Sequence, residues 1–193
     1  MNLESTEIKE ISETRFVFLV KRFQKGDLSA FEELYKMYYQ DLLRYLIAIS
    51  KKPEIAEDIT QETFITAFRK REILDDPTKF KYWLFKIGTR KFQMYLRSRK
   101  DYKLLEVEKH DENITSPSTT VIQQEEKEIV KRALSILCAE KREVLWLHIV
   151  EDVPHTEIAR ILNIPEGTSR SRLHSALQEM EKLIRRKIEY ETR

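Results

Sequence analysis

The carboxy-terminal part of the chain contains the stretch that decides its fold, PHTEIARILNIPEGTSRSRLHSALQEMEKLI, from Pro154 to Ile184. Apolar residues between Ile158 and Leu162 recur at helical spacing. Asn163 follows them and tolerates the left-handed conformation that commonly ends a helix. Pro165 suits the first turn of the next helix, because that turn needs no backbone N–H from it. The stretch therefore predicts two helices across a tight turn.

The second of these helices is amphipathic. With about 100° between successive residues, one side carries Leu173, Leu177, Met180 and Ile184. The opposite side carries Thr168, Ser171, Arg172, Ser175, Gln178 and Lys182, which can donate to base edges and phosphates. No acid lies between Gly167 and Gln178. This favours a DNA-binding helix-turn-helix, whose second helix enters the major groove, over an ordinary helical hairpin with a solvated face.

Composition indicates a helical protein. The 193 residues suffice for one large or two small domains, and three glycines and five prolines allow helix through most of the chain. The net charge of +2 conceals strong segregation. Eight basic residues and no acid lie between Lys79 and Lys100, whereas Glu54 to Phe68 holds four acids and no base. We expect different faces to meet different partners.

Cysteine usage and hydropathy indicate the compartment. Cys138 is the only cysteine, so an intramolecular disulfide is excluded, and we expect a small buried residue in a reducing environment. The amino terminus lacks a basic start followed by an apolar core, and no apolar run is long enough to span a bilayer. A cytoplasmic protein without membrane insertion is expected.

Three amphipathic helices are expected in the first part of the chain. The first runs from Glu13 to Gln24 and is closed by Gly26. The second, capped by Asp27, runs from Leu28 to about Ser50. The third runs from Pro53 to about Arg71.

An acidic ridge is predicted on the third helix, where Asp58, Gln61 and Glu62 project away from the apolar positions. Asp58 and Glu62 lie one turn apart, but a hard cation needs more oxygen ligands than this helix offers. The ridge is therefore either a solvated face or a docking surface for a basic partner.

A fourth helix is expected from Pro77 to about Lys100, capped by Asp76. Its predicted buried stripe comprises Phe80, Trp83, Leu84, Ile87 and Met94. Another face carries Lys79, Tyr82, Lys86, Thr89, Arg90, Gln93, Arg97 and Lys100. Cations neutralise phosphates and exposed rings stack on unpaired bases, so this face predicts nucleic-acid binding.

The chain changes character from Asp101 to Glu128, which holds eight acids, three bases and a helix-breaking run around Pro117. We interpret residues 102–120 as a flexible polar linker between two domains, either a solvated tether or a segment that imitates nucleic acid. Helical pattern resumes near Val121 and again from Arg142 to Val150, and these helices should support the helix-turn-helix.

Catalysis has no support in the sequence. The four histidines, His110, His148, His155 and His174, fall at no recognised metal spacing. The sequence contains no phosphate-binding glycine loop and no nucleophile–base motif. We expect no enzyme activity, no metal and no cofactor.

Taken in order, these features resemble the sigma-70 family, specifically the extracytoplasmic-function, or group IV, sigma factors. The most specific stretches are AEDITQETFITAF at Ala56 to Phe68, FKYWLFKI at Phe80 to Ile87, and KREVLWLHIVEDVPHTEIARILNIPEGTSRSRL at Lys141 to Leu173. The resemblance covers about Phe18 to Ile184. It implies an all-α fold of two helical domains, sigma region 2 at residues 13–101 and sigma region 4 at 121–190, joined by the linker.

The resemblance also implies a function: binding core RNA polymerase, directing it to specific promoters and assisting promoter melting. Region 2 would bind core polymerase through Asp58, Gln61 and Glu62, and the minus-10 element through Lys79, Tyr82, Lys86, Arg90 and Arg97. Region 4 would bind the minus-35 element through Thr168, Arg170, Ser171, Arg172, His174, Ser175 and Gln178. The connector from Lys70 to Asp76 matches the family's loop that captures a flipped minus-10 base. Many relatives are held inactive by an anti-sigma factor, a further partner that the resemblance allows.

The chain departs from the family pattern within both DNA-binding helices. Gly88-Thr89-Arg90 and Met94 replace the usual Ala-Arg-Asn and following Asp, and Ser175 replaces a common arginine. In the recognition helix we expect Arg172 to reach a guanine edge and Arg170, nearer the buried edge, to reach phosphate. The main alternative is a helix-turn-helix regulator that never enters polymerase. Co-elution with core polymerase would distinguish the two.

Overall fold

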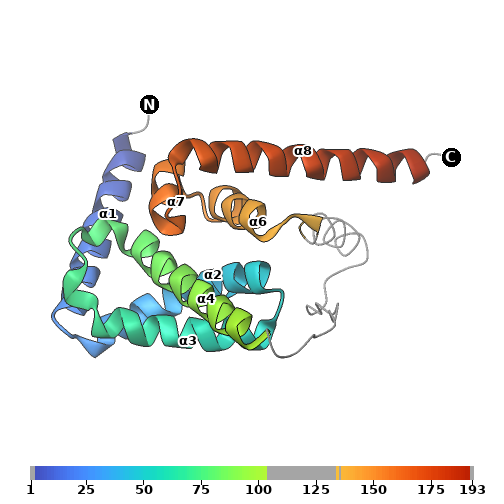
Figure 1. The fold of residues 1–193 in the computed structure, drawn as a ribbon. Helices are drawn as coiled ribbons and strands as arrows, with labels where there is room; N and C mark the ends of the chain where they lie inside the picture. Colours follow the sequence, from blue (N-terminus) through green and yellow to red (C-terminus); the bar gives the residue numbers. More distant parts are fainter. Residues whose placement is uncertain (1–2, 104–133, 135, 192–193) are drawn as a thin grey trace.

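The computed structural model describes residues 3–103, 134 and 136–191, and within them it is helical with no β-strand (Figure 1). The predicted all-α fold is confirmed. Most of the predicted linker and the helix expected to begin near Val121 lie outside the described residues. Within the described part, no helix is long and apolar enough to cross a membrane.

Three helices form the first half of the amino-terminal domain. They are α1 (Leu3–Gln24), α2 (Leu28–Ser50) and α3 (Pro53–Arg69). Asp27 caps α2 as predicted, because its carboxylate accepts from the backbone N–H groups of Ser29 and Ala30. Gly26 precedes it at a φ of +87°, a left-handed conformation that favours glycine.

A connector and one long helix complete this domain. The connector holds two short 3₁₀ turns, η1 (Arg71–Ile73) and η2 (Pro77–Lys79), and leads into α4 (Phe80–Lys103). Gly88 lets α4 approach α2 closely, since a Cβ there would lie 3.1 Å from Leu42 Cδ1. The glycine that replaces the family's usual alanine is thus explained by packing against α2.

The carboxy-terminal domain contains α6 (Ala139–Leu145), the π-helical turn η3 (Trp146–Val150), α7 (His155–Leu162) and α8 (Glu166–Glu191). Asn163 ends α7 at φ 55° and ψ 52°, the left-handed conformation predicted for it. The next helix begins directly after Pro165. The helix-turn-helix is therefore formed by α7 and α8.

The buried apolar side chains of the two domains form one continuous cluster. Fully buried side chains of the first include Phe23, Leu34, Tyr45, Leu46, Phe80, Leu84 and Phe85. Those of the second include Leu137, Val144, Leu147, Ile158 and Ala176. The two domains also touch, since α7 packs on α4 and α6 packs on α2. Figure 1 shows α6, α7 and α8 stacked over α2 and α4, with α3 on the opposite side.

Three sequence-based placements outside α8 are wrong. Met94 was expected in the buried stripe of α4 but is 67% exposed. Thr89 was expected on the basic face but is buried, because its hydroxyl lies 2.9 Å from the buried Tyr45 hydroxyl. Cys138 is exposed rather than buried, since it immediately precedes α6 at the domain surface.

Candidate nucleic-acid and polymerase interface

The acidic ridge lies on the exposed face of α3. Asp58, Gln61 and Glu62 are all exposed. The opposite face of the helix is buried, and Thr60 and Thr63 enter it by donating their hydroxyls to the carbonyls one turn back. Glu62 forms one ion pair, at 2.9 Å to Lys91 of α4. The ridge therefore presents negative charge to solvent without contributing to the core.

The basic face of α4 has two parts. Lys79, Tyr82 and Lys86, near the connector, are half-buried and line a cavity of about 190 Å³. Arg90 and Arg97, farther along the helix, are exposed. The helix thus carries a line of cations that starts at the cavity and continues over open surface.

The cavity lies where the connector meets α4 and α7. Its walls comprise Ile73, Leu74, Asp75, Asp76, Lys79, Tyr82, Trp83, Lys86, Glu157, Arg160 and Ile161. Asp76 caps η2 by accepting from the Thr78 N–H at 2.9 Å, as predicted for this residue. The Thr78 hydroxyl also donates to this carboxylate, at 2.6 Å. The hydroxyl first, and then the backbone N–H, lower the pKa of Asp76 and keep its carboxylate ionised. A ring-lined hollow beside cations is a suitable site for an unpaired base.

The carboxy-terminal domain covers the start of α4 through two ion pairs. Lys79 Nζ lies 2.9 Å from Glu157 Oε1 of α7. Lys81 Nζ lies 3.1 Å from Glu151 Oε2 and also donates to the Glu151 carbonyl at 2.8 Å. Glu151 and Glu157 are both buried. The carboxylates of Glu151 and Glu157 therefore pair with lysines of the amino-terminal domain that could otherwise bind phosphates.

A buried arginine joins the domains a second time. Arg142 of α6 donates from Nη1 to the Ala48 carbonyl of α2 at 3.1 Å, and from Nη2 to the Leu137 carbonyl at 2.9 Å. Only 5% of Arg142 is exposed, so these bonds replace water that the guanidinium has lost. Sequence reasoning missed this contact, because its partners come from separate domains.

Glu143 lies beside this contact and has a perturbed pKa. Burial, followed by the nearby Glu140, raises the pKa of its carboxyl from 4.5 to about 7, although Arg172 and Arg142 oppose the shift. The charge of Glu143 also acts on the buried Tyr45 of α2. The packing of α6 against α2 therefore favours the protonated form of Glu143.

This pKa predicts a pH-dependent stability difference for Glu143→Gln. The folded protein holds the Glu143 proton up to about pH 7, whereas the unfolded chain releases it near 4.5. The protonated carboxyl makes its full contribution to the free energy of unfolding below about pH 4.5, and this contribution is lost as the pH rises to about 7. The neutral variant should thus gain thermal stability relative to wild type at about pH 8 and lose that advantage near pH 5. Thermal unfolding of both proteins at each pH measures the difference, and an equal difference at both would contradict it.

The recognition helix α8 presents one exposed stripe. Arg170, Ser171, His174 and Gln178 are exposed, whereas Thr168, Arg172 and Ser175 are half-buried. The His174 ring and the Gln178 amide nitrogen lie 3.0 Å apart on this stripe. The exposed side chains therefore share a face of α8 that is free to enter a groove.

The expected positions of the two arginines are reversed. Arg172, predicted to point outward, is half-buried, and its charge acts on Glu140 and Glu143 of α6. Arg170, predicted to lie nearer the buried edge, is exposed and pairs with Glu166 one turn back. The buried stripe of α8 also differs from the predicted one, since Leu177 is 45% exposed whereas Ala176 is buried.

The turn before α7 is held by two stacked histidines. The rings of His148 and His155 lie 4.4 Å apart, and His155 Nδ1 lies 2.8 Å from the buried Ser169 hydroxyl of α8. Burial, then the neighbouring His148 and Arg170, lowers the pKa of His155 and favours its neutral form. In the described residues, no group of three or more His, Cys, Asp or Glu side chains is arranged to hold a metal.

Comparison with known sequences identifies both domains. The profile of Sigma-70 region 2 matches residues 34–102, and that of Sigma-70 region 4 matches residues 127–180. These matches cover the acidic ridge, the basic face of α4 and the helix-turn-helix.

Whole proteins match over most of the chain. The ECF RNA polymerase sigma factor SigM of Bacillus subtilis is 32% identical over 162 residues, covering 81% of this chain and 96% of the relative. The ECF RNA polymerase sigma-E factor of Escherichia coli is 29% identical over 183 residues, covering 87% and 95%. The fold matches the sigma factor RpoE of Bartonella quintana, solved with the anti-sigma factor NepR, at a TM-score of 0.65 and 24% identity over 80% of this chain and 96% of that one.

The chain belongs to the sigma-70 family, as one of its extracytoplasmic-function sigma factors. It is a transcription initiation factor, not an enzyme, and it directs core RNA polymerase to promoter DNA. The regulator that acts without polymerase is not favoured.

Proposed function

We propose that three surfaces divide the work of promoter recognition. The acidic ridge of α3 docks on core polymerase, α4 with its connector holds and opens the minus-10 element, and α8 reads the minus-35 element. On this proposal region 2 spans residues 13–101, residues 102–120 link the domains, and region 4 spans 121–190. The observation that carries the proposal is the line of cations on α4 that begins at the connector cavity and continues over open surface.

The ridge suits polymerase docking because it is negative, exposed and outside the buried core. Asp58, Gln61 and Glu62 are exposed on α3, and the buried positions of that helix lie on its other side. Electrostatic complementarity with a basic partner would orient the sigma factor before tighter contacts form.

Promoter opening uses the connector and α4 together. A base leaving the duplex costs a few kcal/mol of stacking, which a pocket must offset. The cavity beside Tyr82 and Trp83 offers rings, and Lys79 and Lys86 at its edge offer cations for the adjoining phosphates. Arg90 and Arg97 would then hold the neighbouring duplex. No catalytic chemistry is needed for melting by this route.

Promoter binding requires the two domains to separate. The ion pair between Lys79 and Glu157 competes with the binding of a phosphate by Lys79. In addition, residues of α7 line the connector cavity. We therefore infer that polymerase binding, which must place regions 2 and 4 on separate promoter elements, removes α7 from α4. An anti-sigma factor, the class of partner that NepR is for the Bartonella protein, would act by preserving the closed arrangement. Transcription initiation by this protein takes place in the cytoplasm, where polymerase and promoters are found.

The recognition helix supplies a test of the minus-35 assignment. Arg170→Ala is expected to lower affinity by about 1–3 kcal/mol at one base position and to relax preference there, since Arg170 lies on the exposed stripe. Arg172→Ala should weaken all sequences alike, because Arg172 faces the acids of α6. Thr168, Ser171, His174, Ser175 and Gln178 supply the remaining contacts in this proposal.

A binding selection on randomised minus-35 sequences, performed with each variant, measures both effects. Arg185→Ala is the matched control, since Arg185 is exposed on α8 and pairs with Glu181. If Arg172→Ala changed the selected sequence while Arg170→Ala did not, the assignment of the two arginines would be reversed.

A further inference from the structure

We propose that the stacked rings of His148 and His155 hold the start of the recognition helix in place for minus-35 reading while the rings are neutral, and that protonation in mild acid releases it. The inference rests on the proposed reading of the minus-35 element by α8. It adds a proton-dependent positioning device, since neither histidine is among the residues proposed to contact DNA. Figure 1 shows α7, which begins at His155, beside the start of α8.

The two histidines connect three elements of the carboxy-terminal domain. His148 lies in η3, His155 is the first residue of α7, and Ser169 lies in the first turn of α8. The two rings lie 4.4 Å apart, with an angle of 19° between their planes. His155 Nδ1 lies 2.8 Å from the Ser169 hydroxyl oxygen. Ring and hydrogen-bond contacts therefore run from η3 through α7 to α8.

Ser169 brings these contacts to the residues that face DNA. It is 0% exposed, so loss of the hydrogen bond to His155 would leave a buried hydroxyl without this partner, which is unfavourable. Its sequence neighbours Thr168 and Arg170 both belong to the proposed minus-35 surface. A movement of the His155 ring that displaces Ser169 therefore also displaces the side chains on either side of it.

The hydrogen bonds and the stacking fit neutral rings. A carbonyl oxygen only accepts, so His148 Nδ1, which lies 3.0 Å from the Val153 carbonyl oxygen, carries the hydrogen. In the neutral ring Nε2 then carries none, and protonation adds a charge to a ring that already lies against His155. Two charged rings at this separation would repel each other.

The charges around His155 also disfavour its protonation. His155 lies at the amino terminus of α7, where the helix dipole disfavours a cation. Arg170 and Glu166 of α8 both act on it, and these two form an ion pair with each other. Burial, followed by His148 and Arg170, lowers the pKa of His155. The packed arrangement therefore favours the neutral ring.

Charged groups towards the other neighbours of η3 and α7 have partners of their own. Towards α4, Glu157 pairs with Lys79 and Glu151 pairs with Lys81. Towards α2, the guanidinium of Arg142 donates to the Ala48 carbonyl. The charges that act on His155 thus come from His148 and from α8.

Acid should favour release of the stacked pair. A released histidine takes up its proton near the ordinary pKa of 6.5, whereas the packed His155 does so at lower pH. The stability of the packed arrangement is therefore complete above about pH 6.5 and falls as the pH drops below that value. At about pH 5.5 a released imidazole is charged about ten times as often as it is neutral, which sets the size of the effect.

A direct phosphate contact by these rings would give the opposite pH dependence. The first helix of a helix-turn-helix lies across the DNA backbone, and a charged histidine there would strengthen binding in acid. The contacts favour positioning instead, because Nδ1 of His155 faces the buried Ser169 and one face of its ring lies against His148.

The test uses holoenzyme reconstituted from core polymerase and the full chain. Its affinity is measured for two promoters, one with the minus-35 sequence obtained by selection and one in which that element is scrambled. The ratio of the two affinities is the minus-35 preference, and acid effects on core binding or melting cancel in it. Wild type should lose about tenfold of this preference between about pH 7.5 and about pH 5.5.

His148→Asn with His155→Asn is the decisive variant. The asparagine amide places a hydrogen-bonding group near the position of Nδ1 but takes up no proton at these pH values. The double variant should therefore keep the same minus-35 preference at both pH values. Wild type and variant both contain the exposed His174, so its titration does not contribute to the difference between them.

Ser169→Ala tests the hydrogen bond without changing either ring. It should lower the minus-35 preference about threefold or more at about pH 7.5, because the partner of His155 on α8 is removed. Binding of the scrambled promoter should stay unchanged. Thermal unfolding at the same pH shows whether each variant is folded, and His155→Asn alone replaces the double variant if that one does not fold.

The outcomes separate this inference from the proposed function. If the asparagine variant loses as much preference in acid as wild type, or if Ser169→Ala keeps the full preference, the inference is wrong. A wild-type preference that rises in acid and no longer does so in the asparagine variant would make the rings phosphate contacts, and would also overturn it. Failure of the α8 assignment would appear differently, as the absence of any minus-35 preference in wild type at about pH 7.5.

Discussion

Alanine at Lys86, Arg90 and Arg97 together is expected to abolish most open-complex formation while leaving assembly with core polymerase intact. Each duplex phosphate contact contributes about 0.9 to the salt slope, so the loss of three should lower it by 2–3 units, or about a hundredfold or more in affinity at low salt. Permanganate footprinting of the non-template strand reports melting directly. The three side chains lie on one face of α4, and none contributes to the buried core.

The triple variant also separates binding from folding. Surface substitutions usually change stability by about 0.5 kcal/mol or less, so its thermal unfolding should stay close to that of wild type. Normal melting by a stably folded triple variant would show that this face of α4 is only a solvated surface.

Charge reversal of the acidic ridge is expected to have the second large effect. Asp58→Lys with Glu62→Lys should weaken core polymerase binding at least tenfold, because like charges placed in an interface cost several kcal/mol. Reversal also removes the ion pair between Glu62 and Lys91, an exposed pair worth about 0–1 kcal/mol. The folded protein should therefore survive, and the loss should appear in a titration of labelled core polymerase.

Glu32→Lys serves as the matched control for this experiment. Glu32 is exposed on α2 and pairs with Lys36, so its reversal changes charge and breaks an ion pair away from the ridge. Equal losses of core affinity from the ridge and from Glu32 would point to net charge rather than docking.

Local chemistry explains what could be predicted from sequence. Asp27 and Asp76 cap their turns, and Asn163 adopts the left-handed conformation between α7 and α8, because these effects depend on neighbours only a few residues away. The apolar period likewise placed α2 within a residue or two of its observed bounds.

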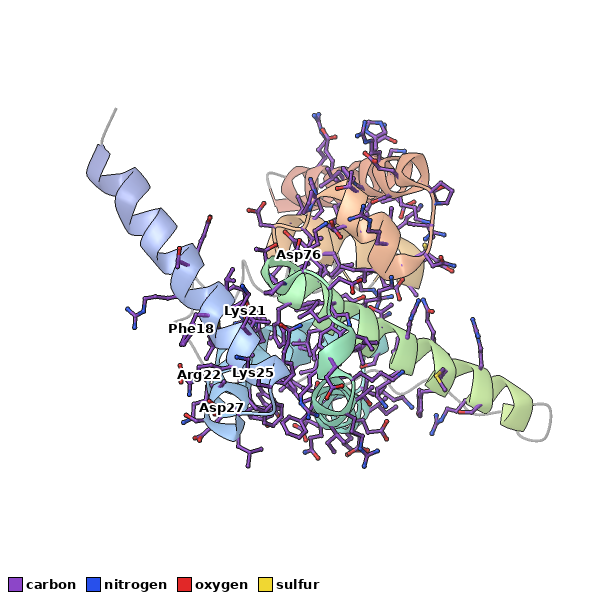
Figure 2. All side chains as sticks on the ribbon, turned by 90° about the vertical axis from the view of Figure 1, so that its left-hand side faces the viewer. Phe18, Lys21, Arg22, Lys25, Asp27 and Asp76 are labelled. Carbon is purple, nitrogen blue, oxygen red and sulfur yellow. The ribbon has the colours of Figure 1, made fainter. Side chains whose placement is uncertain are left out.

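Tertiary packing explains what sequence could not reveal. Met94 follows the helical period of Phe80 and Leu84 on α4, the long helix that extends to the right in Figure 2, yet it is 67% exposed. Phe92, which lies about 200° away around the helix axis, is the side chain buried at this level of α4. The burial of Thr89 depends on Tyr45, which is distant in sequence. The ion pair between Lys79 and Glu157 joins residues 78 positions apart and belongs to the domain interface. Periodicity within one helix contains no signal for such contacts.

The central claim is best tested by initiation with purified components. Core polymerase is combined with the chain on genomic DNA, and transcript 5′ ends are mapped for the wild-type protein, the α4 triple variant and the ridge reversal. The account predicts new start sites that share two upstream elements at fixed spacing and that disappear with either variant. Start sites that require another sigma factor, or that persist in both variants, would contradict it.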